Sequence, residues 1–251
     1  MEQTDVIQLR KRFFDLANMA ERKNIVTFSN FLNMNELNEF HQLERELPVS
    51  YQFSGGYEFA ERQMVAFIPD ALYYEWSFPI CCIKYSPAYP KFAEELSHRD
   101  VLGALMNLGI ERSRVGDIKL LEKDAYVFCE ETLAEYLCSA ITTIRHTVVS
   151  AEFVLLENFT FEQKYEEIFG TVSSERLDTI ISFLTNQSRS QSVMMIQSQK
   201  VFVNNKLVTS NAYFCKTGDV LSLRGYGKYI FDGVIGQTRK QKQKIALRQY
   251  I

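Results

Sequence analysis

The sequence predicts an α+β protein of three small domains, covering residues 1–78, 79–165 and 171–251. Three observations lead to this prediction. A chain of 251 residues is longer than most single domains. Helix-like and strand-like periodicities alternate along it without an internal repeat. The formal net charge of −3 hides two different parts, because residues 1–170 hold 16 Lys and Arg against 27 Asp and Glu, whereas residues 171–251 hold 12 against 4.

Composition places the chain among ordinary folded proteins. Hydrophobic residues make up 46% and charged residues 24% of the sequence, which is enough apolar material for a core. The most apolar stretch, residues 76–83, is flanked by Glu75 and Lys84, so it falls far short of the roughly 18 residues that a membrane helix needs. The first residues lack the apolar segment and cleavage site of a signal peptide. We therefore expect a cytoplasmic protein without a membrane span.

Five cysteines and three histidines do not suggest a metal site or a disulfide framework. The cysteines are odd in number, and no two form the C-x-x-C pair that is typical of zinc and redox sites. We expect buried thiols, no metal and no cofactor.

The first domain is predicted to be a small α/β unit. Apolar residues recur at helical spacing over residues 4–22, which predicts an amphipathic helix, and a short strand is expected over residues 25–28. Asn33, with Glu36 three residues later, has the pattern of a capping box at the start of a second helix. The apolar run 64–68 predicts a strand after a Gly-Gly turn.

The middle domain shows the element order β-α-β-β-α-β. The predicted elements cover residues 80–85, 97–108, 116–121, 126–129, 133–144 and 147–156. This order is the ferredoxin-like pattern that RRM domains share. An RRM also needs an aromatic-rich RNP1 strand on its open sheet face, and Tyr126-Val127-Phe128 is only a fragment of one. The sequence therefore predicts an RRM-like fold, without support for RNA binding by this domain.

The last domain is predicted to pack two helices on a small antiparallel sheet. Ser174 is expected to cap the first helix, and Ser188 or Ser190 the second. Strands are expected over residues 200–204 and 220–224. Because the domain is strongly basic, its expected partner is a polyanion, most simply nucleic acid, and the alternative is a solvated basic tail.

Two short motifs resemble catalytic ones without their context. His98-Arg99-Asp100 has the letters of a kinase catalytic loop, but the fifth residue after the Asp is Leu105 and no DFG or glycine-rich loop is present. A capping box that starts with Ser97 explains the motif better. Arg176-Leu177-Asp178 matches three letters of the aspartate motif of pseudouridine synthases. The ordinary expectation is that Asp178 pairs with a neighbouring Arg.

The segment Gly225-Tyr226-Gly227 is too short for a dinucleotide-binding loop. We leave two interpretations open for it. It is either a turn at the end of a strand or a close backbone approach to a phosphate.

Several motifs occur in one order in the last domain, and together they resemble the S-four RNA-binding domain. They are Ser174-Glu-Arg-Leu-Asp178, Ser188-Arg-Ser190, Lys200-Val-x-Val-Asn204, Gly218-Asp219 and Ser222-Leu-Arg-Gly-x-Gly-Lys228. Upstream, Gly55-Gly-Tyr-x-x-Ala-Glu-Arg62 and the run from Leu96 to Arg112, followed by Gly116-Asp-Ile118, resemble the YlmH family of Gram-positive and related bacteria. This second resemblance covers nearly the whole chain.

The resemblance implies a three-part architecture and a non-enzymatic RNA-binding protein. It implies binding to ribosomal RNA and tRNA, in particular on large ribosomal subunits that still hold peptidyl-tRNA after a stalled ribosome splits, and a link to cell division. The RNA-binding residues that it implies are Arg176, Ser188, Arg189, Ser190, Lys200, Asn204, Arg224 and Lys228. We add Phe202, Arg239 and Lys240 to this candidate surface.

Some of these candidates have structural alternatives. Ser188 and Ser190 could serve only as helix caps, and Asn204 could be a turn residue. Phe202 could stack on a base if it faces outward, whereas an inward side chain would mean a different strand register. Lys228 stands where such domains favour Arg, which keeps the charge but not the bidentate geometry.

Two other functions stay open at the level of sequence. The chain could be an RNA-modifying enzyme with a pocket in residues 1–170, for which Glu61, Arg62, His98 and Asp100 are the groups to inspect. It could also be a scaffold linked to cell division. In the preferred interpretation, the acidic first half meets protein partners or sets geometry on the ribosome.

Overall fold

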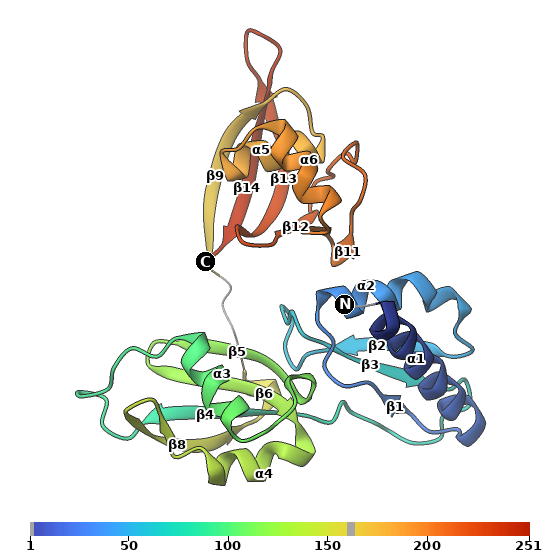
Figure 1. Cartoon of the computed structure of the whole chain (residues 1–251), viewed down its shortest axis with the longest axis vertical. Helices are drawn as coiled ribbons and strands as arrows, with labels where there is room; N and C mark the ends of the chain where they lie inside the picture. The colour runs from blue at the N-terminus through green and yellow to red at the C-terminus, as the bar shows by residue number, and fades with distance from the viewer. Residues whose placement is uncertain (1–2, 160–163) are drawn as a thin grey trace. The chain divides into compact units, whose positions relative to one another are not determined.

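The structure is a computed structural model that describes residues 3–159 and 164–251. The chain forms two compact units, residues 1–161 and 162–251, which are drawn in Figure 1. Within residues 3–159 and 164–251, no helix is long and apolar enough to cross a membrane.

The boundary between the units lies a few residues before the predicted one at 165–171. Strand β9 (Tyr165–Val172) pairs along its whole length with β14 (Gln243–Tyr250), so it belongs to the C-terminal sheet. The C-terminal unit therefore also includes Glu166 and Glu167. It holds 13 Lys and Arg against 7 Asp and Glu, a net charge of +6, and residues 1–161 hold 15 against 24, a net of −9. The charge asymmetry is smaller than predicted, but it remains.

The first part of the N-terminal unit packs two helices against a three-stranded antiparallel sheet of order β1-β3-β2. Its elements are α1 (Gln3–Lys23), β1 (Thr27–Phe28), α2 (Met34–Leu43), β2 (Ser50–Ser54) and β3 (Met64–Ile68). Phe13 of α1, Phe40 of α2 and Phe67 of β3 meet in the core with ring centroids 5.3–6.4 Å apart. The predicted capping box is confirmed, since the Asn33 side chain accepts from the backbone of Glu36 and the Glu36 side chain accepts from that of Asn33.

The second part has the predicted ferredoxin-like topology. Its elements are β4 (Ile80–Pro87), α3 (His98–Asn107), β5 (Val115–Leu121), β6 (Asp124–Glu130), α4 (Glu131–Ala140), β7 (Thr143–Ile144) and β8 (Thr147–Val154). The sheet order β5-β6-β4-β8-β7 places the first strand between the third and the fourth of the pattern, as two interleaved βαβ halves require. One 3-10 turn, Arg112–Arg114, directly precedes β5, and another, Leu156–Asn158, follows β8.

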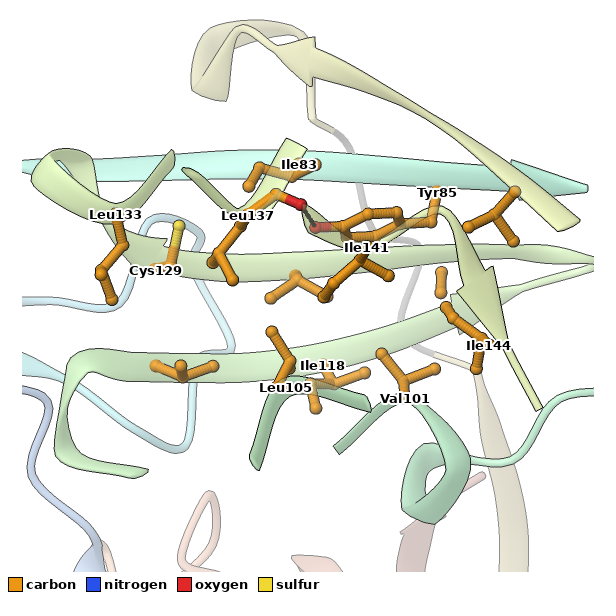
Figure 2. Packing of buried hydrophobic residues seen from close by; sticks show 14 of the residues in the cluster. Ile83, Tyr85, Val101, Leu105, Ile118, Cys129, Leu133, Leu137, Ile141 and Ile144 are labelled. Atoms are coloured by element: carbon orange, nitrogen blue, oxygen red, sulfur yellow. Dashed lines mark hydrogen bonds between the residues drawn. The ribbon is translucent and has the colours of Figure 1, made fainter. Parts of the chain in front are cut away.

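Helices α3 and α4 cover one face of this sheet. Figure 2 shows Val101 and Leu105 of α3 and Leu133 and Leu137 of α4 in one buried cluster with Tyr85, whose hydroxyl donates to the Leu137 carbonyl at 3.0 Å. Helix α4 is shorter than predicted. It ends at Ala140, and the apolar residues beyond it reach the same core from a turn and from β7.

The opposite face of the ferredoxin-like sheet is closed. Phe128, which occupies the position of an RNP1 aromatic residue, is fully buried. The ring of Tyr57 stacks on it with centroids 4.8 Å apart, and Phe159 packs edge-on at 5.0 Å. Residues of the first part, among them Phe31 and Met64, complete this second core cluster. The first 161 residues therefore form one unit, although the sequence predicts two domains, because they share this core.

The C-terminal unit is a six-stranded antiparallel sheet of order β11-β10-β12-β13-β14-β9 with two helices on one face. Its further elements are α5 (Leu177–Thr185), α6 (Arg189–Gln197), β10 (Val201–Val203), β11 (Lys206–Leu207), β12 (Val220–Leu223) and β13 (Gly227–Gln237). Ser188 caps α6 in a capping box with Gln191, as predicted. The predicted cap by Ser174 is wrong, since α5 begins at Leu177 and its N-cap residue, Arg176, gives no side-chain cap.

Candidate nucleic-acid interface

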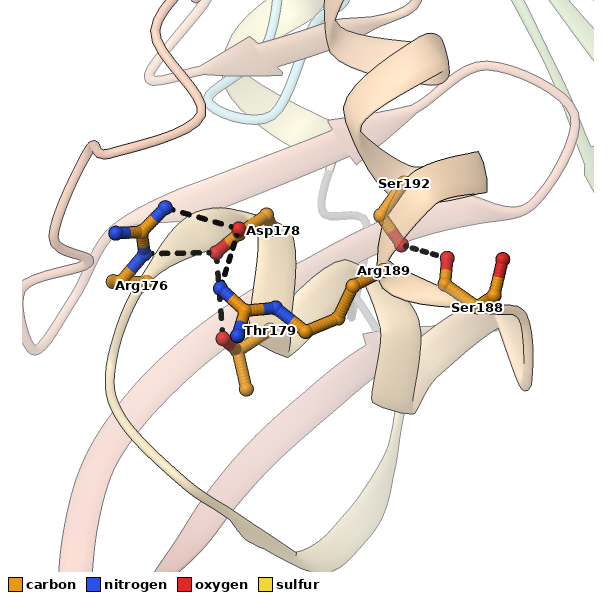
Figure 3. A network of polar contacts seen from close by, with 6 residues as sticks. All are labelled: Arg176, Asp178, Thr179, Ser188, Arg189 and Ser192. Carbon is orange, nitrogen blue, oxygen red and sulfur yellow. Dashed lines mark hydrogen bonds and ion pairs between the residues drawn. The ribbon is translucent and has the colours of Figure 1, made fainter.

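One buried carboxylate holds two arginines at the start of the two C-terminal helices (Figure 3). Asp178 lies in the first turn of α5, with only 3% of its side chain exposed. Arg176 donates to it from Nε and Nη2, both at 3.1 Å, and Arg189, the first residue of α6, donates from Nη2 at 2.7 Å. The predicted pairing of Asp178 with a neighbouring Arg is confirmed, and the carboxylate binds both arginines.

This cluster keeps a net positive charge at the surface. Burial alone would raise the pKa of Asp178, but hydrogen bonds and charges from Arg176 and Arg189 lower it below its ordinary value. The carboxylate is thus ionised at neutral pH, and it balances one of two guanidinium groups. The Arg189 side chain is 55% exposed and that of Arg176 is 32% exposed. Since Arg176 uses two nitrogens on Asp178 and Arg189 one, Arg189 is the better placed to bind an anion.

The N-terminus of α6 adds polar groups beside Arg189. The Ser188 hydroxyl accepts from the backbone N–H of Gln191 at 3.3 Å and lies 2.9 Å from the Ser190 hydroxyl. Both serines are exposed. Ser188 is therefore a cap, and it also remains accessible at the end of the helix where the dipole favours negative charge.

Lys200 and Arg224 lie together at one end of the sheet. The backbone N–H of Arg224 donates to the Lys200 carbonyl at 2.9 Å, and both residues are exposed. In the following turn, the Tyr226 hydroxyl accepts from Gln187 at 2.6 Å. Because Gln187 directly precedes Ser188, this bond joins the sheet end to the start of α6. We call Arg176, Ser188, Arg189, Ser190, Lys200 and Arg224 the helix-side surface.

The backbone of Gly225-Tyr226-Gly227 favours the interpretation of this segment as a turn at the end of a strand. Gly225 has φ +89°, which a side chain would strain. The Tyr226 backbone N–H donates to the Leu223 carbonyl at 2.9 Å, and strand β13 starts at Gly227. The segment is thus a turn between adjacent strands.

Two predicted RNA contacts are at odds with the structure. Phe202 is only 3% exposed, so it presents no ring for base stacking. Asn204 donates to the Asp219 carboxylate at 2.8 Å and accepts from the backbone N–H of Val220 at 2.9 Å. With φ +50° at Asn204 and +62° at Asn205, this pair forms the two-residue turn between β10 and β11. The turn interpretation of Asn204 is therefore the better one.

The remaining predicted residues lie elsewhere on the unit. The Lys228 ammonium lies 4.9 Å from the centre of the Tyr250 ring, on the sheet face opposite the helices. Arg239 and Lys240 are exposed at the tip of the β13–β14 hairpin, which projects beyond the rest of the unit in Figure 1. The predicted set is therefore divided among three places. Gln187 and Tyr226, whose hydrogen bond connects the helix-side surface, were not among the predicted residues, because they carry no charge that could signal them.

Glu61 and Arg62, two of the four residues considered for a pocket in the N-terminal half, take part in a hydrogen-bonded brace around Asp117. The buried Asp117 accepts hydrogen bonds from the Tyr57 hydroxyl and from the backbone of Glu61, each at 2.7 Å, and from the backbone of Arg62 at 3.1 Å. The Arg62 side chain donates to the carbonyl of Phe31 at 2.9 Å. These bonds fix the Gly-Gly-Tyr loop against strand β5.

A cavity of about 490 Å³ in the N-terminal unit lies between α3 and residues 140–145, at and beyond the end of α4. Asp100 and Arg145 line it, 3.7 Å apart. Hydrogen bonds from Ser97 hold the pKa of Asp100 below its ordinary value, which confirms the predicted capping box. Among residues 3–159 and 164–251, no three His, Cys, Asp or Glu side chains gather as metal ligands would. Burial raises the pKa of Cys82 and Cys215 to about 12, so these thiols are protonated.

Comparisons with known proteins find one domain model in each unit. A family model described as "Putative RNA-binding domain in YlmH" matches residues 74–158, which include the ferredoxin-like domain for which the sequence motifs did not support RNA binding. A model of the S4 (S-four) domain matches residues 175–221. The "Ribosome-associated protein quality control protein P2" of Bacillus subtilis is 30% identical over 223 residues, which are 88% of this chain and 86% of that protein.

A solved structure supports the fold. The "Cell division protein ylmH from Streptococcus pneumoniae" superposes with a TM-score of 0.51 at 21% identity, covering 62% of this chain and 95% of that one. The identity to the Bacillus subtilis protein over nearly the full length of both chains, together with the two matched domains, confirms the resemblance drawn from the motifs. The chain belongs to the YlmH family and carries its C-terminal S-four RNA-binding domain.

Proposed function

We propose that this protein binds ribosomal RNA and tRNA on large ribosomal subunits that carry peptidyl-tRNA, in the quality control of stalled translation. The name of the Bacillus subtilis relative supports ribosome-associated quality control. The observation that carries the proposal is the pair of arginines held by Asp178, beside the exposed start of α6 and the cations at the sheet end. We expect the protein to work in the cytoplasm, where ribosomes are found.

The geometry suits contacts to the RNA backbone. Arg189, Lys200 and Arg224 are exposed cations on a rigid frame of two helices and a sheet end. Such groups bind phosphates and fix the position of a protein on RNA, but they do not read sequence. Selection of the right RNA then depends on shape, because the major groove of an RNA duplex is too deep and narrow for side chains to read.

The acidic N-terminal unit is proposed to act without catalysis. Asp100, which lines the cavity beside α3, has its pKa lowered by hydrogen bonds from Ser97, so it is a poor general acid. The sheet face that would carry bases in an RRM is filled by Tyr57 and Phe159. We propose that this unit sets geometry on the ribosome or contacts protein partners.

Sedimentation with ribosomal particles tests the proposal. The full-length protein is mixed with purified small subunits, empty large subunits or large subunits that carry peptidyl-tRNA, and each mixture is separated on a sucrose gradient at physiological salt. We expect the protein to travel with large subunits, most completely with those that carry peptidyl-tRNA. Arg189→Ala should remain in the top fractions. Lys23→Ala, which removes an equal charge from exposed residue 23 of α1, should behave as wild type.

Two outcomes would contradict the proposal. One is a wild-type protein that stays at the top of every gradient. The other is equal binding to small and large subunits, which would reduce the interaction to general attraction between a basic unit and RNA.

A further inference from the structure

The two helices cover only one face of the C-terminal sheet. Tyr229 and Phe231 of β13 and Ile245 and Leu247 of β14 point toward the helices and are buried. Because side chains alternate along a strand, their neighbours point to the opposite face. We call this opposite side of β9, β13 and β14 the outer face, and six aromatic and cationic residues lie on it, namely Tyr165, Phe169, Lys228, Lys244, Arg248 and Tyr250.

Aromatic rings and cations meet on the outer face. The rings of Tyr165 and Tyr250, paired across β9 and β14, have centroids 5.1 Å apart. The Lys228 ammonium lies 4.9 Å from the centre of the Tyr250 ring, and the Arg248 guanidinium lies 5.0 Å from that of Tyr165. These distances are those of cation–π contacts. Each tyrosine thus has a positive charge beside it.

Phe169 is the most accessible ring of this face. Phe169 pairs with Ala246 on β14, whose side chain is too small to cover the phenyl ring. Phe169 is 62% exposed. It stands four residues after Tyr165 on β9, which corresponds to about 13 Å along a strand. The rings of Tyr165 and Phe169 therefore lie on the same side of one strand.

The charge of the outer face favours an anionic ligand. Lys228, Lys244 and Arg248 stand against Glu167 and Asp232, and Asp232 is already bound by Arg248 at 2.7–3.1 Å. The whole unit has a net charge of +6. Exposed aromatic rings beside cations on an open sheet are how proteins bind unpaired nucleotides, since bases stack on the rings and phosphates contact the cations.

We propose that the outer face of β9, β13 and β14 is a second RNA-binding surface, which takes unpaired nucleotides. Its six aromatic and cationic residues all lie outside residues 175–221, which match the S-four model. The inference adds a surface to the proposed function and does not depend on the helix-side surface, which lies across the sheet.

Binding of the full-length protein to two RNA probes tests this inference. One probe is single-stranded oligouridylate of about ten nucleotides. The other is an RNA hairpin with a fully paired stem and a short loop. Phe169→Ala should weaken binding to oligouridylate about 5- to 150-fold, the effect of losing one stacked base, and should leave hairpin binding unchanged. The matched control is Phe153→Ala, since Phe153 is also exposed, at 57%, but lies in the N-terminal unit.

A conservative variant supplies a second measurement. Phe169→Trp should keep the affinity for oligouridylate, and its fluorescence should be quenched when a base stacks on the indole. Trp76 is the single native tryptophan, so the wild type gives the background signal. Because Phe169 is largely exposed, both variants are expected to fold, which circular dichroism checks.

The results separate this inference from the proposed function. Unchanged oligouridylate binding by a folded Phe169→Ala variant, or equal weakening for both probes, would overturn the inference. A different result is possible, in which Phe169→Ala weakens binding to oligouridylate only and Arg189→Ala leaves binding to the hairpin and to ribosomal subunits unchanged. That result would support the outer face as an RNA-binding surface and contradict the function proposed for the helix-side surface.

Discussion

Arg189 gives the sharpest test of the helix-side surface, through the salt dependence of RNA binding. Each phosphate contact releases condensed counterions, so the slope of log K against log salt changes by about 0.7–0.9 per contact. The helix-side surface holds four cations, Arg176, Arg189, Lys200 and Arg224, of which all but Arg176 are exposed. If all four contact phosphates, the slope is about −3, and affinity falls roughly 60-fold between 50 and 200 mM salt.

Replacing Arg189 by Ala should remove one of these contacts and leave Asp178 paired with Arg176. The variant should bind ribosomal RNA more weakly than wild type. The ratio of the wild-type affinity to the variant affinity should fall about threefold between 50 and 200 mM salt. The weakening should be similar for an unrelated RNA duplex, because phosphates carry no sequence. The assay is fluorescence anisotropy with labelled RNA over a salt series, with Lys23→Ala as the control for net charge.

An unchanged slope with intact affinity in folded Arg189→Ala would refute this reasoning. Arg189 would then be only a structural partner of Asp178, to which it donates at 2.7 Å. A slope that changes equally in Lys23→Ala would show that the assay reports net charge and not a local contact.

Four further predictions concern stability and the division of the chain. Asn204→Ala should lower the free energy of unfolding by about 1–3 kcal/mol in urea titrations, because Asp219 loses a hydrogen bond, and should leave the salt slope of RNA binding unchanged. The pKa of Asp178 is lowered in the folded state, so the Asp178 carboxylate stabilises the fold above its unfolded-state pKa of about 3.9, and this stabilisation is lost as the pH falls below that value. Asp178→Asn should therefore reduce the difference between the free energies of unfolding measured at pH 7 and at pH 3. Gly56→Ala should destabilise the N-terminal unit by about 2–4 kcal/mol in thermal unfolding, since its φ is +93° and a Cβ would lie 2.7 Å from the Phe128 ring. Residues 162–251 expressed alone should fold and bind RNA at physiological salt, whereas residues 1–161 alone should not bind RNA. A C-terminal fragment that starts at residue 171 should melt at a lower temperature than residues 162–251, because it lacks most of β9. Equal melting temperatures of the two C-terminal fragments would contradict the role given to that strand.

Local sequence patterns were sufficient for most helices and strands. The capping boxes at Asn33 and Ser97 could be identified because a capping box depends on residues three positions apart, whereas the cap of α6 could be predicted only as Ser188 or Ser190. The ferredoxin-like order could be identified because it depends only on the succession of elements. The predictions of a cap at Ser174 and of a longer α4 were wrong. At the start of α5 and at the end of α4, the chain leaves the helix to make tertiary contacts, which a local sequence pattern does not contain.

The candidate site was predictable in type but not in arrangement. Arg176 and Arg189 could be identified from motifs and charge, but their shared carboxylate required residues of α5 and α6 to come together. Phe202 and Asn204 looked equally suited to RNA in the sequence. Burial of Phe202 argues against the stacking role predicted for it, and the hydrogen bond of Asn204 to Asp219 favours its interpretation as a turn residue.

The α+β class, the basic last third and the resemblance to the YlmH family could be predicted without a structure, because these properties depend on composition and on short-range order. Three other features became visible only in the folded chain: β9 belongs to the C-terminal sheet, Tyr57 closes the RRM-like face, and Lys228 and Phe169 share the outer face. Each of these depends on strand pairing or packing between residues far apart in the chain. Such contacts are selected by the burial of apolar surface across the whole unit, which no local window of sequence records.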